Sequence, residues 1–171
     1  MAIVYTHNSS DFTFYGHCDA DWGGRERSDS KSTSGYIFFA SNAPISWASK
    51  VQSAVALSSC EAKYISLAEA SKQVAYFHHL LSSIGIPKYK IQLGNDNQSA
   101  LTIASSHVHA FHPRLKHIKL KVHFIRDRIA KGKIRLFYVP TQEMRADMLT
   151  KPLARPKFEH LLQRSGLKLI K

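Results

Sequence analysis

At about Ser58 the pattern of apolar residues changes from one typical of strands to one typical of a helix. This change limits the folds that the chain can adopt. Before Ser58, three segments rich in aromatic and small residues are typical of strands: 12–19, 33–40 and 43–50. After it, apolar residues recur at helical spacing as far as about Ser83. The two-residue link Ser41-Asn42 predicts that the second and third strands form an antiparallel hairpin.

The rest of the chain alternates between strand and helix. Strands are expected at 90–96 and 133–140, and helices at 97–106, at 120–131 and from about Glu143 to Leu167 with bends at Pro152 and Pro156. A hairpin followed by β-α-β crossovers predicts an α/β domain in which helices flank a mixed sheet. Because the sequence contains no repeat or linker, we expect one domain over residues 1–171, with a core of about 12–165.

The charge of the chain favours a polyanionic partner. The formal net charge is +12, from 24 Lys and Arg against 12 Asp and Glu. Nine basic residues and one acid, Asp127, lie in the segment from Arg114 to Arg135. A solvated helix face would also carry such a run, so nucleic-acid contact is one of two interpretations at this point.

Four acids lie where elements are expected to begin or end. Asp19 and Asp96 close strands, and ligand sites of open sheets form beyond the carboxyl ends of their strands. Glu61 falls in the first turn of the long helix, and Asp147 in the first turns of the last one. Carboxylates suit hard cations such as Mg²⁺, and two such ions roughly 3.5–4 Å apart can hydrolyse a phosphodiester.

Each acid also has a simpler interpretation. Ser58 and Glu61 have the spacing of a capping box. Asp96 could cap the short helix that follows, and Asp147 could complement a helix dipole. Asp19 could stabilise the loop after its strand.

Aromatic and sulfur side chains near these acids are expected to serve packing. Alternation along a strand predicts that Cys18 faces the core while Asp19 faces the site. Trp47 and Tyr64 are expected in the core, and Trp22 beside the site.

Six motifs occur in the order in which they are found in one known family: HCDADWGG, SDSKSTSGYIFF, PISWASKVQSAVALSSCEAKYISL, LGNDNQSALTIA, FHPRLKHIKLKVHFIRD and ADMLTKPL. Over roughly residues 15–160 the chain resembles the RNase H domain of copia-type LTR retrotransposon Pol polyproteins. The resemblance implies an RNase H-like fold with a central five-stranded mixed sheet. It also implies an endoribonuclease that cuts the RNA strand of RNA–DNA hybrids with two Mg²⁺ ions, or with Mn²⁺. The catalytic and metal-binding residues that it implies are Asp19, Glu61, Asp96 and Asp147.

The same resemblance suggests partners and context. A reverse-transcriptase domain is expected in the parent polyprotein, so the chain is expected to be an excised domain, a fragment or a domesticated remnant. We expect an isolated monomer without membrane contact, inside the cell in cytoplasm, nucleus or virus-like particle. The alternative is a catalytically silent, domesticated or fossil module that only binds nucleic acid. Residues expected to contact the hybrid are Asn97, Gln98, Arg114, Lys116, His117, Lys119, Lys121 and Arg126, the two amides through sugar hydroxyls.

Overall fold

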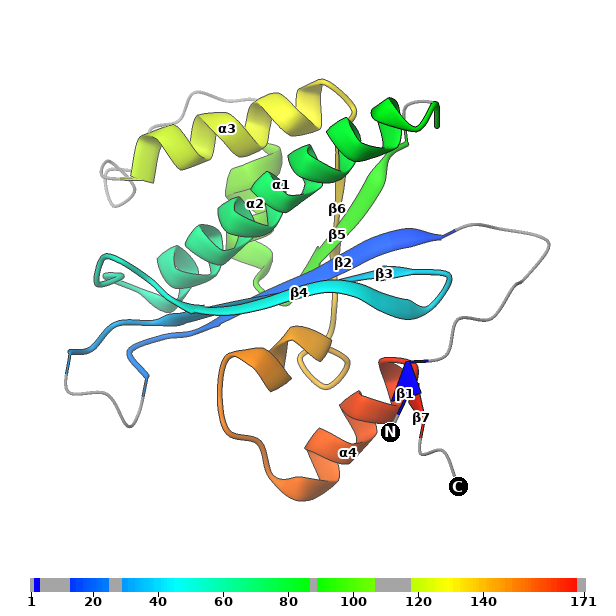
Figure 1. The fold of residues 1–171 in the computed structure, drawn as a ribbon. Coiled ribbons are helices and arrows are strands. Elements are labelled where there is room, and N and C mark those ends of the chain that lie inside the picture. Colours follow the sequence, from blue (N-terminus) through cyan, green and yellow to red (C-terminus); the bar gives the residue numbers. More distant parts are fainter. Residues whose placement is uncertain (1, 4–12, 25–28, 87–88, 107–117, 169–171) are drawn as a thin grey trace.

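Five strands form one mixed sheet in the computed structural model of the chain, which describes residues 2–3, 13–24, 29–86, 89–106 and 118–168 (Figure 1). The order across the sheet is β4-β3-β2-β5-β6, in which β2, β3 and β4 are antiparallel neighbours and β5 is parallel to both β2 and β6. The predicted hairpin and mixed sheet are confirmed. The strands are β2 (Phe14–Asp21), β3 (Thr33–Ala40), β4 (Ala43–Val51), β5 (Ile91–Asn95) and β6 (Ile134–Tyr138).

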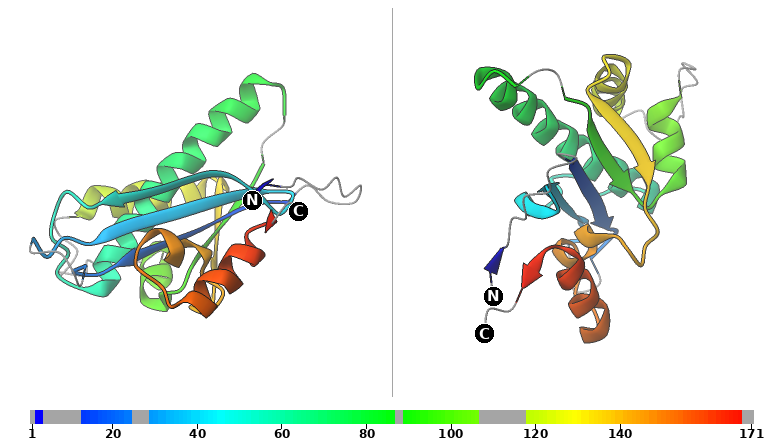
Figure 2. Two further views of the ribbon diagram at one scale, coloured as in Figure 1. Left: turned by 60° about the horizontal axis from the view of Figure 1, so that its bottom comes forward. Right: turned by 90° about the vertical axis from the view of Figure 1, so that its right-hand side faces the viewer.

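Helices lie on both faces of this sheet (Figures 1 and 2). One face is covered by α1 (Ser59–Ser83), α2 (Gln98–Ser105) and α3 (Lys119–Ala130), and the other by the 3₁₀ helix η2 (Arg145–Leu149) and by α4 (Arg155–Arg164). Among the described residues, no helix has the length and apolar character that a membrane crossing needs.

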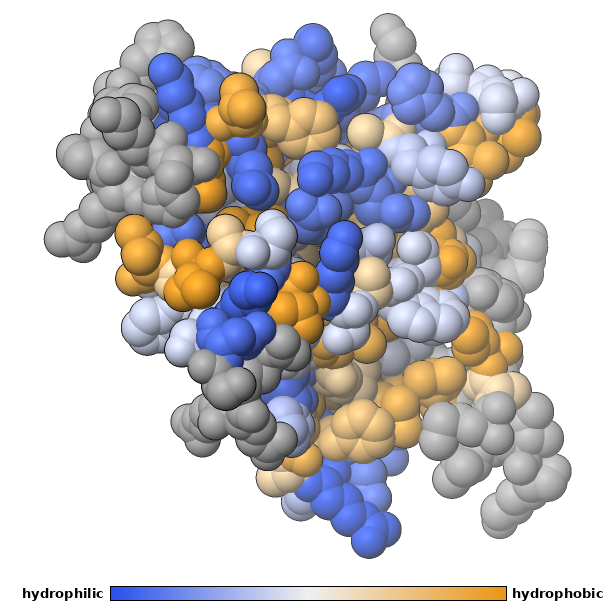
Figure 3. Space-filling model, turned by 60° about the vertical axis from the view of Figure 1, so that its left-hand side comes forward, coloured by the Kyte–Doolittle hydropathy of each residue, from blue (hydrophilic) through white to orange (hydrophobic). Residues whose placement is uncertain are grey.

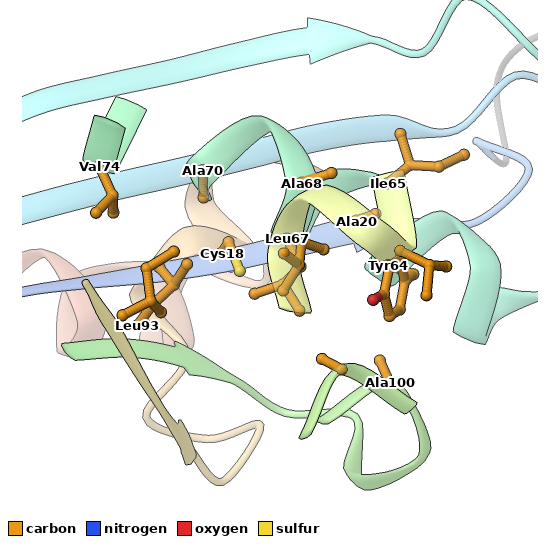
Figure 4. Packing of buried hydrophobic residues seen from close by; sticks show 14 of the residues in the cluster. Cys18, Ala20, Tyr64, Ile65, Leu67, Ala68, Ala70, Val74, Leu93 and Ala100 are labelled. Atoms are coloured by element: carbon orange, nitrogen blue, oxygen red, sulfur yellow. The ribbon is translucent and has the colours of Figure 1, made fainter. Parts of the chain in front are cut away.

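Side-chain alternation along β2 divides the molecule into two packed layers. Phe14, Cys18 and Ala20 are buried on the side of α1, where they meet Tyr64 and Leu67 (Figure 4). Tyr15, His17 and Asp19 point to the other face, toward η2 and the residue after it. The prediction that Cys18 faces the core is therefore confirmed, as is the burial of Tyr64.

The C-terminal region differs from the single bent helix that the sequence predicts. Residues 150–154 are not helical, so the stretch is divided into η2 and α4. Proline lacks an N–H donor and resists the helix interior, which explains a break at Pro152 and the place of Pro156 in the first turn of α4. A short antiparallel pair, β1 (Ala2–Ile3) with β7 (Leu167–Lys168), was not predicted, because two-residue strands carry no periodic signal.

Trp47 is exposed to 55%, so its predicted burial is wrong. It lies on β4, which is an edge strand of the sheet, whereas α1 lies over β2, β3 and β5. Strand propensity alone does not distinguish an edge strand from a central one.

Gly94 allows β5 to pack closely against the end of β6 and the residue that follows it. A Cβ atom at this position would lie 2.8 Å from Cζ of Phe137 and still closer to Val139. We expect Gly94→Ala to lower the free energy of unfolding by about 1–3 kcal/mol, because a well-packed neighbourhood must move. Urea unfolding measures this change, and Ser99→Ala, on the exposed side of α2, is the control. Equal stability of the two variants would contradict the close packing.

Candidate carboxylate site

Two adjacent parallel strands bring Asp19 and Asp96 together. His17 on β2 pairs with Gly94 on β5, so each aspartate lies two residues beyond the same step of the ladder. The side chain of Asp19 is 0% exposed and that of Asp96 is 4% exposed. Asn97 caps α2 by accepting a hydrogen bond from the Ala100 N–H at 2.8 Å, so the capping interpretation of Asp96 does not hold.

Asp147 joins them from the opposite layer. It lies on η2, which packs over β2 and β3, and its side chain is fully buried. Gly35 permits this approach, since a Cβ atom there would lie 2.8 Å from Cγ2 of Thr150 and 2.9 Å from Cβ of Leu149. Lys151 links Asp147 to Asp19, since its ammonium group lies near both carboxylates.

Three lysines lie among the three aspartates. Lys63 of α1 donates to Oδ1 of Asp19 at 2.7 Å and to Oδ1 of Asp96 at 2.5 Å. Lys151 lies 3.0 Å from Oδ1 of Asp147 and 3.5 Å from Oδ2 of Asp19. Lys157 donates to Oδ2 of Asp147 at 2.6 Å. The charges of the aspartates are thus balanced by ammonium groups of the chain itself.

Two hydroxyl groups complete the contacts of the carboxylates. Thr150 donates to Oδ2 of Asp19 at 3.1 Å, and Thr141 donates to Oδ2 of Asp96 at 2.9 Å. Oδ1 of Asp147 is buried and accepts no hydrogen bond, so its contact with Lys151 is an ion pair only. Every carboxylate oxygen of the three aspartates therefore faces a donor or a cation.

The lysines control the protonation of this site. Burial alone would raise the pKa of Asp19, but the charge of Lys63 and contacts with Asp147 and Lys151 lower it to about 2. The pKa of Asp147 is raised, first by burial and then by the neighbouring Asp19. Burial lowers the pKa of Lys63, yet Asp19 and Asp96 outweigh it and raise that pKa above its ordinary value. Lys63 is therefore charged at neutral pH.

Glu61 lies at the start of α1 in the contacts of a helix cap. Its N–H donates to Oγ of Ser58 at 3.2 Å, and its Oε2 accepts from the N–H of Leu57 at 2.9 Å. It shares a stripe of α1 with Ile65 and Glu69, and these three residues line a pocket beside the end of β4. Positions 61 and 63 are about 200° apart around a helix, so one of them faces the aspartates and the other does not.

The three aspartates have the right donor chemistry for a hard divalent cation, since such ions prefer carboxylate oxygens. Among the residues that the structure describes, however, no three His, Cys, Asp or Glu side chains are placed to hold one metal ion. Lys63 and Lys151 occupy the space between the carboxylates, and ammonium groups do not bind metals. The aspartates are therefore suitable ligands for the predicted magnesium ions, but the lysines between them are not.

The residues predicted to contact nucleic acid are dispersed. Arg114, Lys116 and His117 lie outside the described residues. Lys119 and Lys121 lie in the first turn of α3. Figure 3 shows one face of the molecule, on which hydrophilic and hydrophobic residues are interspersed. Arg126 has a structural contact, because its guanidinium donates to the carbonyl oxygen of Ile103 at 2.9 and 3.2 Å. Gln98 is exposed, and Oδ1 of Asn97 is used by the cap of α2.

Sequence reasoning missed Lys63, Lys151 and Thr150. The sequence did contain a signal for Lys63. Glu61 has the spacing from Ser58 that a capping box requires, and residues two apart on a helix point in different directions. If Glu61 serves the cap, Lys63 can point toward the ends of the strands.

No family model matches the chain. Its curated relatives include the retrovirus-related Pol polyproteins from transposons RE2 and RE1 of Arabidopsis thaliana, each 36% identical over 165 residues, or 96% of this chain. That from transposon TNT 1-94 of Nicotiana tabacum is 37% identical over 150 residues, or 88% of this chain. The chain spans 11% of the length of these relatives.

Solved structures share the architecture at low sequence identity. RNase H1 from the archaeon Halobacterium salinarum NRC-1 has a TM-score of 0.57 and 15% identity, over 81% of this chain and 94% of that one. LC11-RNase H1 from a compost metagenome, in complex with an RNA/DNA hybrid, has a TM-score of 0.60 and 15% identity over the same shares. At these identities the likeness concerns the fold.

Proposed function

The chain is a homologue of the retrovirus-related Pol polyproteins of copia-type transposons and has the RNase H fold; on this premise we propose that it acts on the RNA strand of RNA–DNA hybrids. Reaction at this strand would take place where Asp19, Asp96 and Asp147 meet. A reverse-transcriptase domain in a parent polyprotein is the proposed source of the hybrid. The solved complex of LC11-RNase H1 with an RNA/DNA hybrid supports this choice of substrate.

The observation that carries the proposal is the convergence of three aspartates from elements far apart in the sequence. Asp19 and Asp147 are separated by more than a hundred residues, yet both are fully buried and share the ammonium group of Lys151. Burial of carboxylates is costly, and a fold has little reason to collect three of them at a sheet edge for stability alone. A sheet edge at the carboxyl ends of parallel strands is a common place for a ligand site.

The basic character of the chain supports a nucleic-acid partner. The net charge of +12 persists after the three site lysines are matched with three aspartates, since both kinds are already counted in it. The excess therefore lies elsewhere, and Lys119 and Lys121 are parts of it that we propose to contact the sugar-phosphate backbone. Such contacts release counterions, so binding would weaken as the salt concentration rises.

Hydrolysis with two Mg²⁺ or Mn²⁺ ions is the finer part of the proposal. The aspartates support it, because carboxylate oxygens are the preferred ligands of such ions. The lysines argue against it, because their ammonium groups lie between the carboxylates. Glu61, the fourth ligand expected from the resemblance, would have to leave its capping contacts to take part.

A second candidate is a catalytically silent module that binds hybrids. Lys63 favours it specifically, because its ammonium group bridges Asp19 and Asp96. Such a module would bind hybrids with the same dependence on salt and would not cut them.

Cleavage of an end-labelled RNA–DNA hybrid over a range of Mg²⁺ and Mn²⁺ concentrations tests the proposal. We expect the parent chain to cut the RNA strand at high metal concentration, and Asp96→Asn to cut roughly tenfold or more slowly. Binding of the uncut hybrid, measured in EDTA by fluorescence anisotropy, should be similar for both. Binding without cutting at any metal concentration would identify the silent module, and binding no stronger than to a neutral polymer would overturn both candidates.

A further inference from the structure

We propose that Lys63 is a built-in cation that holds the position of a divalent metal ion between Asp19 and Asp96, so that the site accepts Mg²⁺ or Mn²⁺ only when this side chain is displaced. The relevance of this inference to catalysis rests on the proposed function. The competition between the ammonium group and a metal ion follows from the contacts of Lys63 alone.

The first support is the position of the ammonium group. Nζ of Lys63 lies within 2.7 Å of one carboxylate and 2.5 Å of another, and these carboxylates follow two adjacent parallel strands. A cation that bridges two acids from neighbouring strand ends is the arrangement that a metal ion would adopt. The side chain of Lys63 is only 16% exposed, so water screens these contacts weakly.

The second support is the balance of charge. Asp19, Asp96 and Asp147 contribute three negative charges, and Lys63, Lys151 and Lys157 contribute three positive ones. A divalent ion gains less attraction from a site of zero net charge than from an acidic one, and it must also lose part of its hydration shell. With Lys63 removed, the same site carries one uncompensated negative charge.

The third support is the phase of α1. The stripe through Glu61, Ile65 and Glu69 faces the pocket beside β4, whereas position 63 faces the aspartates. A carboxylate from this helix would therefore reach Asp19 and Asp96 from position 63. Lys63→Glu is expected to replace the internal cation with a fourth ligand.

Metal binding by calorimetry, with Mn²⁺ alone as the probe, tests the inference on the parent, Lys63→Glu and Lys63→Met. We expect Mn²⁺ to bind Lys63→Glu roughly tenfold or more tightly than the parent, because a positive charge is exchanged for a negative one beside a divalent ion. Lys63→Met, which removes the charge and keeps the length, should lie between them. Lys72→Glu is the matched control: Lys72 lies on the same helix, is 59% exposed, and should leave the affinity of the parent unchanged.

Thermal unfolding gives a second measurement that does not depend on cleavage. Lys63→Glu gathers four acids without metal, so its melting temperature should rise with Mn²⁺ by more than that of the parent. If Lys63→Glu does not fold without metal, Lys63→Met decides the question. Equal Mn²⁺ affinity of the parent and of both Lys63 variants would overturn the inference.

Hybrid cleavage separates this inference from the proposed function. A Lys63→Glu chain that binds Mn²⁺ tightly but neither binds nor cuts hybrids would support the inference and contradict the function. A parent that cuts hybrids at low Mg²⁺, with an affinity that Lys63 variants do not change, would contradict the inference and support the function.

Discussion

Replacing Asp19 by asparagine is expected to lower the free energy of unfolding at pH 7 by about 3 kcal/mol, because Lys63 and Lys151 each lose one of their two carboxylate partners in a largely buried site. Asp19 accepts from both Lys63 and Thr150, and its side chain is fully buried. The opposite sign is expected for a cluster of carboxylates that waits for metal, since removal of one acid would relieve repulsion among the others. The sign of the change therefore reports which cation neutralises the site.

Urea unfolding in EDTA measures this change, and Asp127→Asn is its control. Asp127 pairs with Lys131 at 2.9 Å on the exposed side of α3, and loss of such a pair should change stability by about 0.5 kcal/mol or less. A variant Asp19→Asn that is as stable as the parent, or more stable, would show that the lysines do not neutralise the site. Lys63→Met in the Asp19→Asn background should recover part of the loss, because the two remaining aspartates then face two lysines and not three.

The contacts of Asp19 with its lysines also predict that the stability of the folded chain depends on pH. The pKa of Asp19 is lowered to about 2 in the folded chain, below its ordinary value of 3.8. The unfolded chain therefore takes up this proton first as the pH falls. The contribution of Asp19 is fully present above about pH 4 and is lost as the pH falls toward 2.

The sheet was predictable from the sequence because its strands and helices differ in apolar period. The alternation of β2, the short turn after β3 and the long helical repeat of α1 are local signals that agree with one another. The positions of Asp19 and Asp96 followed from the same signals, because both lie where strands end. Trp47 was misplaced because edge position is decided by the whole sheet and not by the strand itself.

The cations of the site were harder to predict because they depend on tertiary contacts. Lys151 and Lys157 reach Asp147 only after the chain leaves η2 and turns at Pro152. Lys63 was overlooked because Glu61, two residues earlier, has a side chain of the expected chemistry. Helix phase separates the two positions, but only the approach of α1 to the sheet determines which of them faces the aspartates.

His17 provides the other large effect, a loss of stability in mild acid. It lies on the η2 side of β2, packed against Phe39 and Phe137, and its Nδ1 accepts from the N–H of Arg145 at 3.4 Å. Burial first, and then the charge of Arg145, lowers the pKa of His17 from 6.5 to about 3, although Glu143 opposes this. The folded chain thus keeps His17 neutral where the unfolded chain would protonate it.

Because the folded pKa is lowered, the contribution of His17 is fully present above pH 6.5 and is lost as the pH falls toward 3. The expected slope is about 1.4 kcal/mol per pH unit, or about 5 kcal/mol over the whole window. Urea midpoints between about pH 7 and pH 4.5 measure this slope before the carboxylates titrate.

His17→Asn retains an acceptor for the Arg145 N–H and cannot be protonated, so its stability should vary much less over this range. His123→Asn, on the exposed face of α3, should keep the slope of the parent. If His17→Asn and the parent lost stability equally, the acid sensitivity would have to arise from another group, and the buried, neutral His17 would not be its cause.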